Sequence, residues 1–257
     1  VLDSVSYPHS LGMLYTAFTQ YLGFPNYGDE YKVMGLAPYG KPTYSNEVRD
    51  AIRLLPGGLF KLNPAFFSHF QQGVHMSWQG GTPEIAPLFG QEMIRRFGPP
   101  RAVGEALSDL HRNLAASVQA LCEEVIFYLA EDLHSKTGLP ALCLAGGVGQ
   151  NSVANGKILR NTSFQQVFIP PATHDAGTAM GSALYWQHHI RGAARSNHPA
   201  PAYTGAHFSQ EAIIAAIEAS GNAYDIYDSE EALLDFTATK LAAGAVVGWF
   251  QGKAEFG

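Results

Sequence analysis

The chain has 257 residues, and 16 Lys and Arg stand against 22 Asp and Glu, which gives a formal net charge of -6. That length allows one large domain or two smaller ones, each with its own core, and 46% hydrophobic with 15% charged residues excludes a disordered or fibrous chain. The acidic balance and the absence of a Lys/Arg cluster argue against a surface for nucleic acid or an anionic membrane, so a small, specific ligand is favoured.

The first predicted elements are two helices. Apolar residues recur at helical spacing over Ser10–Leu22, and Ser10 is a suitable N-cap. A shorter helix is expected within residues 29–40, where Pro38 would end it. Residues 41–100 have no clean period and contain paired Gly and Pro residues. We expect an irregular insertion there, made of short helices and hairpin pieces.

The next part of the sequence predicts an α/β unit. Apolar residues recur every three or four positions over 101–137 and predict one long helix, which Gly138 would close. The elements predicted after it are a strand at 141–145, a glycine turn, a helix from about Asn151, a strand at 165–169 and a helix over 175–190. This order of helices and strands is typical of an α/β fold.

A change in composition suggests a second domain. The stretch 191–205 is rich in Ala, Pro, Asn and Ser without a period. We therefore place a linker at 193–207, between a first domain over 1–192 and the start of a second over 208–257. The elements predicted beyond the linker are helices at 209–219 and 229–243 and strands at 224–227 and 245–250.

The cysteines and the chain ends bear on the setting of the protein. Cys122 and Cys143 lie in apolar surroundings without metal-ligand spacing, so a reducing, cytoplasmic compartment is expected. No apolar run reaches the roughly 18 residues of a membrane span, and nothing resembles a signal peptide. The chain begins at Val1 without Met and stops at Gly257, so we expect it to be a piece of a longer protein.

A glycine-rich turn is the first candidate for chemistry. In Leu144–Asn151, a strand runs into glycines and then a helix. Gly146 and Gly147 would let backbone N–H groups approach an anion, and the helix N-terminus adds a positive dipole end, so a phosphate would fit there. Asn151 would cap the helix or reach a ribose or base. The alternative is a tight strand-to-helix turn without a ligand.

A second candidate loop follows the second predicted strand. Asp175 stands at the strand end, before a run of small residues that includes Gly177. A carboxylate at this position can ligate a divalent metal or face a polyphosphate through one. Alternatively, Asp175 is only an N-cap and the small residues serve helix packing. Loops after successive parallel strands open on one sheet edge, so the two loops should meet.

Together and in order, these motifs resemble the nodulation-protein-U family of O-carbamoyltransferases. The segments that carry the resemblance are Tyr7–Gly12, Tyr15–Phe24, Glu30–Gly40, Ala145–Val148 with Asn151, Asp175–Thr178 and Gly248–Gly257. The resemblance implies an actin-like ATPase (ASKHA, ribonuclease-H-like) fold for the first domain and a YrdC-like fold for the second.

The resemblance also implies a reaction. Family members take carbamoyl phosphate and ATP, form carbamoyl-adenylate in the YrdC-like domain, and transfer the carbamoyl group to a hydroxyl of a small acceptor such as a sugar, aminoglycoside or polyketide. By resemblance, Gly146, Gly147, Asn151 and Gly177 would contact the nucleotide, and Asp175 would ligate a divalent metal, expected to be Fe²⁺. A homodimer is also expected.

Two side chains near the start of the chain are candidate catalytic groups. His9 would serve as an acid, a base or an acceptor-binding group, and Lys32 would reach a phosphate. Each has a structural alternative: a histidine that anchors a helix start, and a lysine on a solvated surface.

This sequence departs from the family pattern at two points. It lacks the paired H-x-x-x-H histidines of the metal site, since His188 and His189 are adjacent, and Lys253 stands where the family usually has Arg. By itself this chain is expected to hold the metal poorly. The competing hypotheses are a non-catalytic nucleotide-binding scaffold of the actin-like fold and, less favoured, a sugar kinase of that fold.

Overall fold

A computed structural model describes residues 1–195 and 202–255 of the chain. The described residues divide into two compact units, one over Val1–Gly181 and one from Ser182 onward. Helices and strands are mixed in the first unit, which confirms the predicted α/β class. In the described part of the chain, no helix combines the length and the apolar character that crossing a bilayer requires.

The two predicted N-terminal helices are present. Helix α1 spans Leu11–Tyr21, and the Ser10 side chain caps it by accepting a hydrogen bond from the Met13 backbone N–H at 3.3 Å. Helix α2 spans Glu30–Leu36 and tightens into a 3₁₀ turn over Ala37–Tyr39. Proline lacks the N–H that a longer helix would need, so the helical segment ends soon after Pro38.

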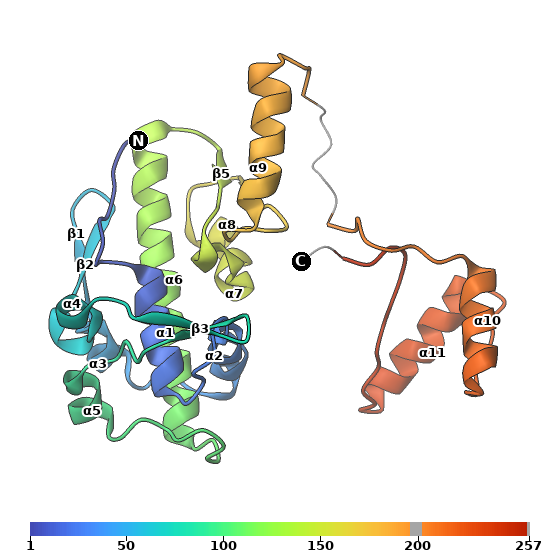
Figure 1. Ribbon diagram of the computed structural model, residues 1–257, viewed down its shortest axis with the longest axis horizontal. Helices are drawn as coiled ribbons and strands as arrows, with labels where there is room; N and C mark the ends of the chain where they lie inside the picture. The colour runs from blue at the N-terminus through green and yellow to red at the C-terminus, as the bar shows by residue number, and fades with distance from the viewer. Residues whose placement is uncertain (196–201, 256–257) are drawn as a thin grey trace. The chain divides into compact units, whose positions relative to one another are not determined.

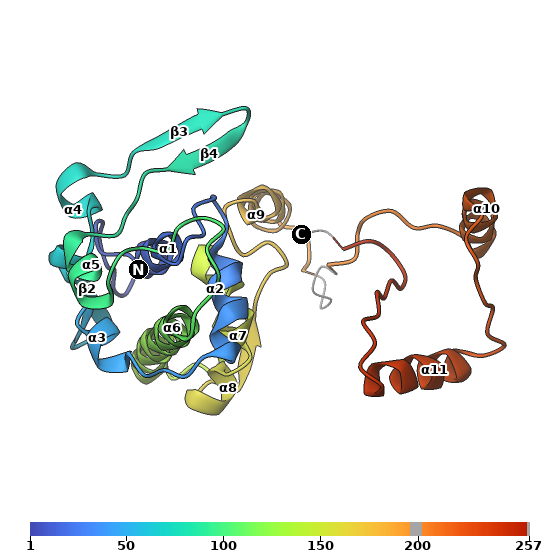
Figure 2. The same cartoon turned by 90° about the horizontal axis from the view of Figure 1, so that it is seen from below.

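Helix α6, Asp109–Thr137, is the longest element and packs against α1 and α2 (Figures 1 and 2). The prediction that it starts at residue 101 was wrong. Gly104 has a φ of +83°, which interrupts helical backbone, and the backbone N–H of Ser108 donates to His111 Nδ1 at 3.0 Å at the actual start. The helix ends at Gly138 in the left-handed conformation, as predicted.

Residues 41–100 form the predicted short helices and hairpins. These elements are α3 (Ser45–Arg49), β1 (Ile52–Leu55), β2 (Leu59–Leu62), a 3₁₀ turn at Pro64–Phe66, α4 (His69–Gln72), β3 (Met76–Gln79), β4 (Thr82–Ile85) and α5 (Gln91–Phe97). The β1–β2 and β3–β4 pairs are antiparallel, and the β3–β4 hairpin projects from the helices (Figure 2).

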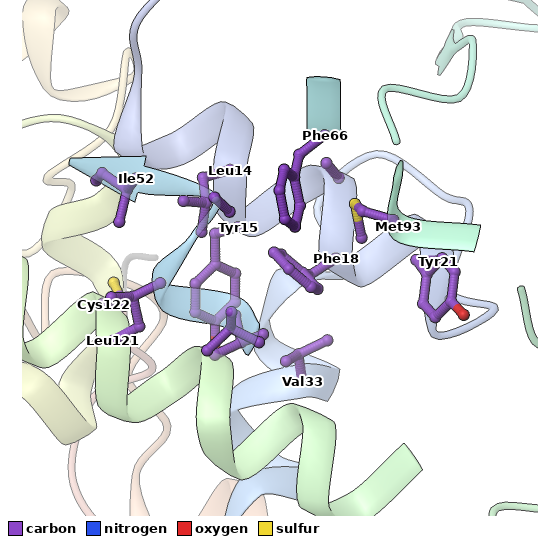
Figure 3. Close-up of a cluster of buried hydrophobic side chains, with 14 of the residues drawn as sticks. Leu14, Tyr15, Phe18, Tyr21, Val33, Ile52, Phe66, Met93, Leu121 and Cys122 are labelled. Atoms are coloured by element: carbon purple, nitrogen blue, oxygen red, sulfur yellow. The ribbon is translucent and has the colours of Figure 1, made fainter. Parts of the chain in front are cut away.

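The main hydrophobic core joins this region to the helices. Leu14, Phe18 and Tyr21 of α1 meet Phe66 and Met93 of the 41–100 region and the α6 side chains (Figure 3). All five of these residues are almost fully buried. Residues 41–100 are therefore part of the core and not a surface appendage.

The predicted α/β unit follows α6. Its elements are β5 (Ala141–Cys143), a 3₁₀ turn at Gly147–Gln150, α7 (Ser152–Asn155), α8 (Ile158–Asn161), β6 (Gln166–Phe168), α9 (Gly177–Tyr185) and a π-helical turn at Trp186–Ile190. Strands β5 and β6 pair in parallel, with Leu142 opposite Val167. A second small core packs Leu142, Ile158 and Phe164 against Ala130 of α6.

Among residues 202–255, the helices are α10 (Gln210–Ser220) and α11 (Glu230–Ala242), as predicted. Each starts at a serine whose side chain caps it. The strands predicted at 224–227 and 245–250 were wrong. A strand needs a partner for its backbone ladder, and no described segment of this unit pairs with either stretch. Residues 196–201 of the predicted linker and residues 256–257 lie outside the described residues.

The contribution of residues 41–100 to the core can be tested by a matched pair of methionine substitutions. Met93 is fully buried on α5, whereas Met76 on β3 is 46% exposed. Met93→Ala should lower the free energy of unfolding by about 2–5 kcal/mol, because it removes a buried side chain and leaves a cavity. Met76→Ala should change it by less than about 0.5 kcal/mol. Urea titration measures both free energies of unfolding. If Met93→Ala changed the free energy as little as Met76→Ala, residues 41–100 would not contribute to the core in this way.

Candidate functional site

The two glycine-bearing loops meet at one edge of the β5–β6 pair. Because the strands are parallel, the loops that follow them leave from the same end. The backbone N–H of Gly146 donates a hydrogen bond to the carbonyl oxygen of Thr173 at 2.7 Å. Gly149 packs against the same residue, since a Cβ at Gly149 would lie 3.4 Å from Thr173 Cβ. The predicted convergence of the loops is confirmed.

The first loop leaves backbone donors open. Gly146 has a φ of +102°, a conformation that favours glycine, whereas Gly147 has no such requirement. A Cβ at Gly147 would meet no atom within 4 Å, and the residue is exposed. Among the described residues, none accepts a hydrogen bond from the backbone N–H of Gly147 or Val148. The loop thus offers two backbone amides without an acceptor among the described residues, and the one at Gly147 lies beside open space, which suits an anion.

Asn151 ends this loop and its side chain is turned inward. Its Oδ1 accepts from the backbone N–H of Ala154 at 3.0 Å, so Asn151 caps α7. The same Oδ1 accepts from Nε2 of Gln119, and Asn151 Nδ2 donates to Gln119 Oε1, both at 3.0 Å. The capping role foreseen for Asn151 is therefore present, together with a carboxamide pair across to α6.

Gln119 lies at the centre of a buried polar network. Its Oε1 also accepts from the Tyr15 hydroxyl at 2.8 Å, and its Nε2 also donates to Glu123 at 2.9 Å. Lys157 donates to both oxygens of Glu123, at 2.7 and 2.8 Å. Burial raises the pKa of Tyr15 far above its ordinary value, so its hydroxyl stays protonated and remains a donor.

The network was missed by sequence reasoning. A signal was present, because Gln119 is a polar residue on the α6 face that carries Ala115, Val118 and Cys122. Burial raises the pKa of the Cys122 thiol to about 12, with Glu123 adding to the effect. The surroundings of Gln119 are thus well desolvated, and a buried amide needs partners. Its partner is 32 residues away, and local patterns do not show such a pairing.

In the second loop, Asp175 and Gly177 have different surroundings. Asp175 is exposed, and none of the described residues hydrogen-bonds to its carboxylate, so it makes no side-chain cap. Its backbone carbonyl accepts from the hydroxyl of Thr178 at 2.6 Å. A Cβ at Gly177 would lie 2.1 Å from the carbonyl oxygen of Ala172. Close packing accounts for glycine at 177.

The described residues do not by themselves form a metal centre. No group of three or more His, Cys, Asp or Glu side chains in residues 1–195 and 202–255 is arranged to hold a metal ion. Asp175 therefore stands as a single potential ligand, and we derive no reaction step through a metal.

His9 and Lys32 make contacts of the kind their structural alternatives expect. His9 Nδ1 accepts from the backbone N–H of Leu62 at 3.1 Å, which fastens the N-terminal segment to β2. Burial lowers the pKa of His9, and Lys61 and His69 add to this, so the ring favours its neutral form. Lys32 pairs with Asp29 at 2.7 Å, and that hydrogen bond raises the pKa of Lys32. The catalytic roles of both stay predictions.

An α/β unit with open backbone amides at a shared strand edge is typical of proteins that bind phosphate-bearing ligands. Residues 2–184 match the family described as Carbamoyltransferase N-terminus. The chain belongs to this family, and its resemblance to the nodulation carbamoyltransferases is confirmed.

Relatives with similar sequences give the extent of the match. The Synechocystis protein sll1178 is 40% identical over 260 residues, covering 98% of this chain and 40% of that protein. Nodulation protein NolO of Bradyrhizobium diazoefficiens is 36% identical over 265 residues, covering 100% and 43%. Nodulation protein NolNO of Sinorhizobium fredii is 33% identical over 249 residues, covering 96% and 33%. The chain thus spans less than half the length of these relatives.

The packing role of Gly177 can be tested against another glycine of α9. Gly177→Ala should destabilise the protein by about 1–3 kcal/mol, because its methyl group collides with the Ala172 carbonyl. A Cβ at Gly181 meets nothing within 4 Å, so Gly181→Ala should be neutral or stabilise by up to about 1 kcal/mol through helix propensity. Thermal unfolding of both variants checks this, and an equally harmless Gly177→Ala would contradict the close approach.

Proposed function

We propose that this chain is part of an ATP-dependent O-carbamoyltransferase, which moves a carbamoyl group from carbamoyl phosphate to a hydroxyl of a small acceptor such as a sugar, aminoglycoside or polyketide. One observation carries the proposal: the two loops meet at one strand edge, with open amides at Gly147 and Val148, in a chain of the carbamoyltransferase family. In this proposal the first unit belongs to an actin-like fold and the second to a YrdC-like one.

The chemistry proposed is a transfer through carbamoyl-adenylate. Carbamoyl phosphate would first react with water to release inorganic phosphate and carbamate, which is a poor electrophile. A carbamate oxygen would then bond to the α-phosphorus of ATP as pyrophosphate leaves, so that the carbamoyl group acquires AMP as a good leaving group. The acceptor oxygen then bonds to the carbamoyl carbon, the bond from that carbon to the AMP phosphate oxygen breaks, and the acceptor proton passes to a base. Fixed hydrogen-bond donors near the carbonyl would stabilise the developing negative oxygen.

The residues of the first loop suit the phosphate end of the adenylate. Backbone N–H groups stabilise phosphate oxygens without a flexible side chain, and glycine at 147 lets a ligand reach the backbone. Asn151 has fewer hydrogen-bonding groups left for a ligand. Its Oδ1 already accepts two hydrogen bonds and its Nδ2 has donated one, so a single N–H remains for a ribose or base.

The metal remains a separate part of the proposal. Asp175 is exposed beside the loop junction, and its free carboxylate is chemically suited to a divalent metal such as Fe²⁺. Bound there, such a metal would act as a Lewis acid toward the carbonyl or the acceptor hydroxyl. It would need further ligands that the described residues do not supply.

The nucleotide part of the proposal is tested by giving Gly147 a side chain. Gly147→Ala should leave the free energy of unfolding within about 0.5 kcal/mol of the parent, because the new methyl group meets no protein atom. It should weaken binding of MgATP roughly tenfold or more, because it keeps phosphate oxygens from the backbone amides. Isothermal titration measures the affinity.

Gly181→Ala is the matched control for this experiment, since it adds the same methyl group at another open glycine. It should bind MgATP as the parent does. If Gly147→Ala also binds MgATP with unchanged affinity, the phosphate does not lie on this loop.

The role of Asp175 is tested in the complete protein. Asp175→Ala should abolish carbamoylation of the acceptor with little change in stability, because the carboxylate is exposed and makes no hydrogen bond with described residues. Formation of carbamoylated product from ATP, carbamoyl phosphate and acceptor, followed by mass spectrometry, measures this. Full activity of the variant would remove Asp175 from the site, and MgATP binding without any product in the parent would favour the scaffold hypothesis.

A further inference from the structure

The side chain of Gln119 is a buried polar group of the first unit whose donors and acceptors are all paired. A glutamine amide can accept two hydrogen bonds and donate two. Gln119 makes all four: it accepts from Tyr15 and Asn151, and it donates to Asn151 and Glu123. The residue is 4% exposed, so these contacts are shielded from water. Buried amides with complete hydrogen bonding hold one orientation.

Glu123 determines the orientation of the Gln119 side-chain amide. An ionised carboxylate only accepts hydrogen bonds, so the Gln119 atom facing it at 2.9 Å has to be the Nε2 donor. The other Gln119 atom, Oε1, then faces the Tyr15 hydroxyl, which donates to it at 2.8 Å. Lys157, at the start of α8, holds Glu123 in place. The charge on Glu123 therefore fixes the Gln119 amide.

The fixed amide in turn orients Asn151. Gln119 presents a donor and an acceptor side by side, so the Asn151 carboxamide must turn its Oδ1 toward Gln119 Nε2 and its Nδ2 toward Gln119 Oε1. In that orientation Oδ1 also caps α7 through Ala154. One N–H of Asn151 Nδ2 is left without an acceptor among the described residues.

From this geometry we infer that Gln119 and Glu123 are positioning residues for the nucleotide site: through the Asn151 carboxamide they set the start of α7 and aim the remaining Asn151 N–H at the ligand. The inference rests on the proposed function, because it takes the loop at Gly146–Val148 to hold the phosphate end of an adenine nucleotide, for which MgATP is the probe. The group that this N–H recognises is a hydrogen-bond acceptor, either a ribose oxygen or a ring nitrogen of the base.

The chain offers an isosteric test with a matched control. Gln119→Glu keeps the shape of the side chain but loses both Nε2 donors, and it adds a second carboxylate beside Glu123. Gln20→Glu makes the same change at another buried glutamine, whose Nε2 donates to the Ile85 carbonyl and whose Oε1 accepts from the Leu88 N–H. Gln20 lies in the core around α1, and its side chain makes no hydrogen bond with the loop at Gly146–Val148.

The readouts are the MgATP affinity of the complete protein and the hydrogen-exchange protection of the Ala154 amide without nucleotide. Gln119→Glu should weaken MgATP binding roughly tenfold or more and lower the Ala154 protection by a similar factor. Gln20→Glu should leave both quantities within about twofold of the parent, even if it lowers the melting temperature as much as Gln119→Glu does. This comparison separates positioning from general destabilisation.

A milder pair covers the case in which Gln119→Glu does not fold. Tyr15→Phe removes the hydroxyl that donates to Gln119, and Tyr21→Phe removes the α1 hydroxyl that donates to the Gly98 carbonyl at 2.6 Å. Tyr15→Phe should weaken MgATP binding by roughly two- to tenfold, the value of one hydrogen bond, and Tyr21→Phe should not change it.

The possible results distinguish this inference from the proposed function. If the parent protein binds no MgATP, the proposed function fails and the inference fails with it. If the parent binds MgATP, the inference is overturned when Gln119→Glu and Tyr15→Phe bind it equally well, or when the Gln20 and Tyr21 controls lose as much affinity. In those cases the proposed function stands and the network serves stability alone.

Discussion

A buried polar side chain is unfavourable unless its donors and acceptors find partners, and this constraint governs how the first unit is joined. Helix α6 carries two cores: Leu114 and Val118 face the large one, and Ala130 faces the small one beside β5. Gln119, on the same helix, is paired with Asn151. The pairing fixes the start of α7 relative to α6, and so connects the apolar packing of the unit to the loop that ends β5.

The glycines of the candidate site fall into two groups. Gly146 and Gly177 are needed by the protein itself, one for its positive φ and the other for the close approach of Ala172. Gly147 satisfies neither need, since its backbone is ordinary and its surroundings are empty. A glycine that neither its backbone conformation nor its neighbours require, with amides at its own position and at Val148 that have no acceptor among the described residues, is the feature of this loop that packing alone does not explain.

Local patterns in the sequence predicted most of the helices, because caps and apolar spacing act over a few residues. Ser10, Ser209 and Ser229 all cap the helices expected after them. Apolar spacing gave wrong predictions where the backbone conformation or the lack of a pairing strand overrode it. Apolar spacing continues through Val103 and Leu107, and Gly104 breaks the backbone between them. The two strands expected in the second unit have suitable residues but no described partner to pair with.

The candidate site, like the fold, could be predicted from the sequence only in part. The meeting of the two loops could be predicted, because parallel strands place their following loops at one edge. The inward turn of Asn151 could not, because its partner Gln119 is far away in sequence and only the folded helix brings them together. The distinction between Gly147 and Gly177 also required coordinates, since both stand in similar runs of small residues.

The geometry of the loop also limits what it can do unaided. Small-molecule sites enclose most of their ligand, whereas Gly147 and Asp175 are both exposed. In the proposed site, two amides and one Asn151 N–H would contact the nucleotide, and each such hydrogen bond would contribute about 1 kcal/mol net. In the proposal these donors form one wall of the site, and tight binding would require contacts on the opposite side of the ligand. If the Gln119 network positions Asn151 as inferred, it would lower the ordering cost of binding to such a one-sided set of donors.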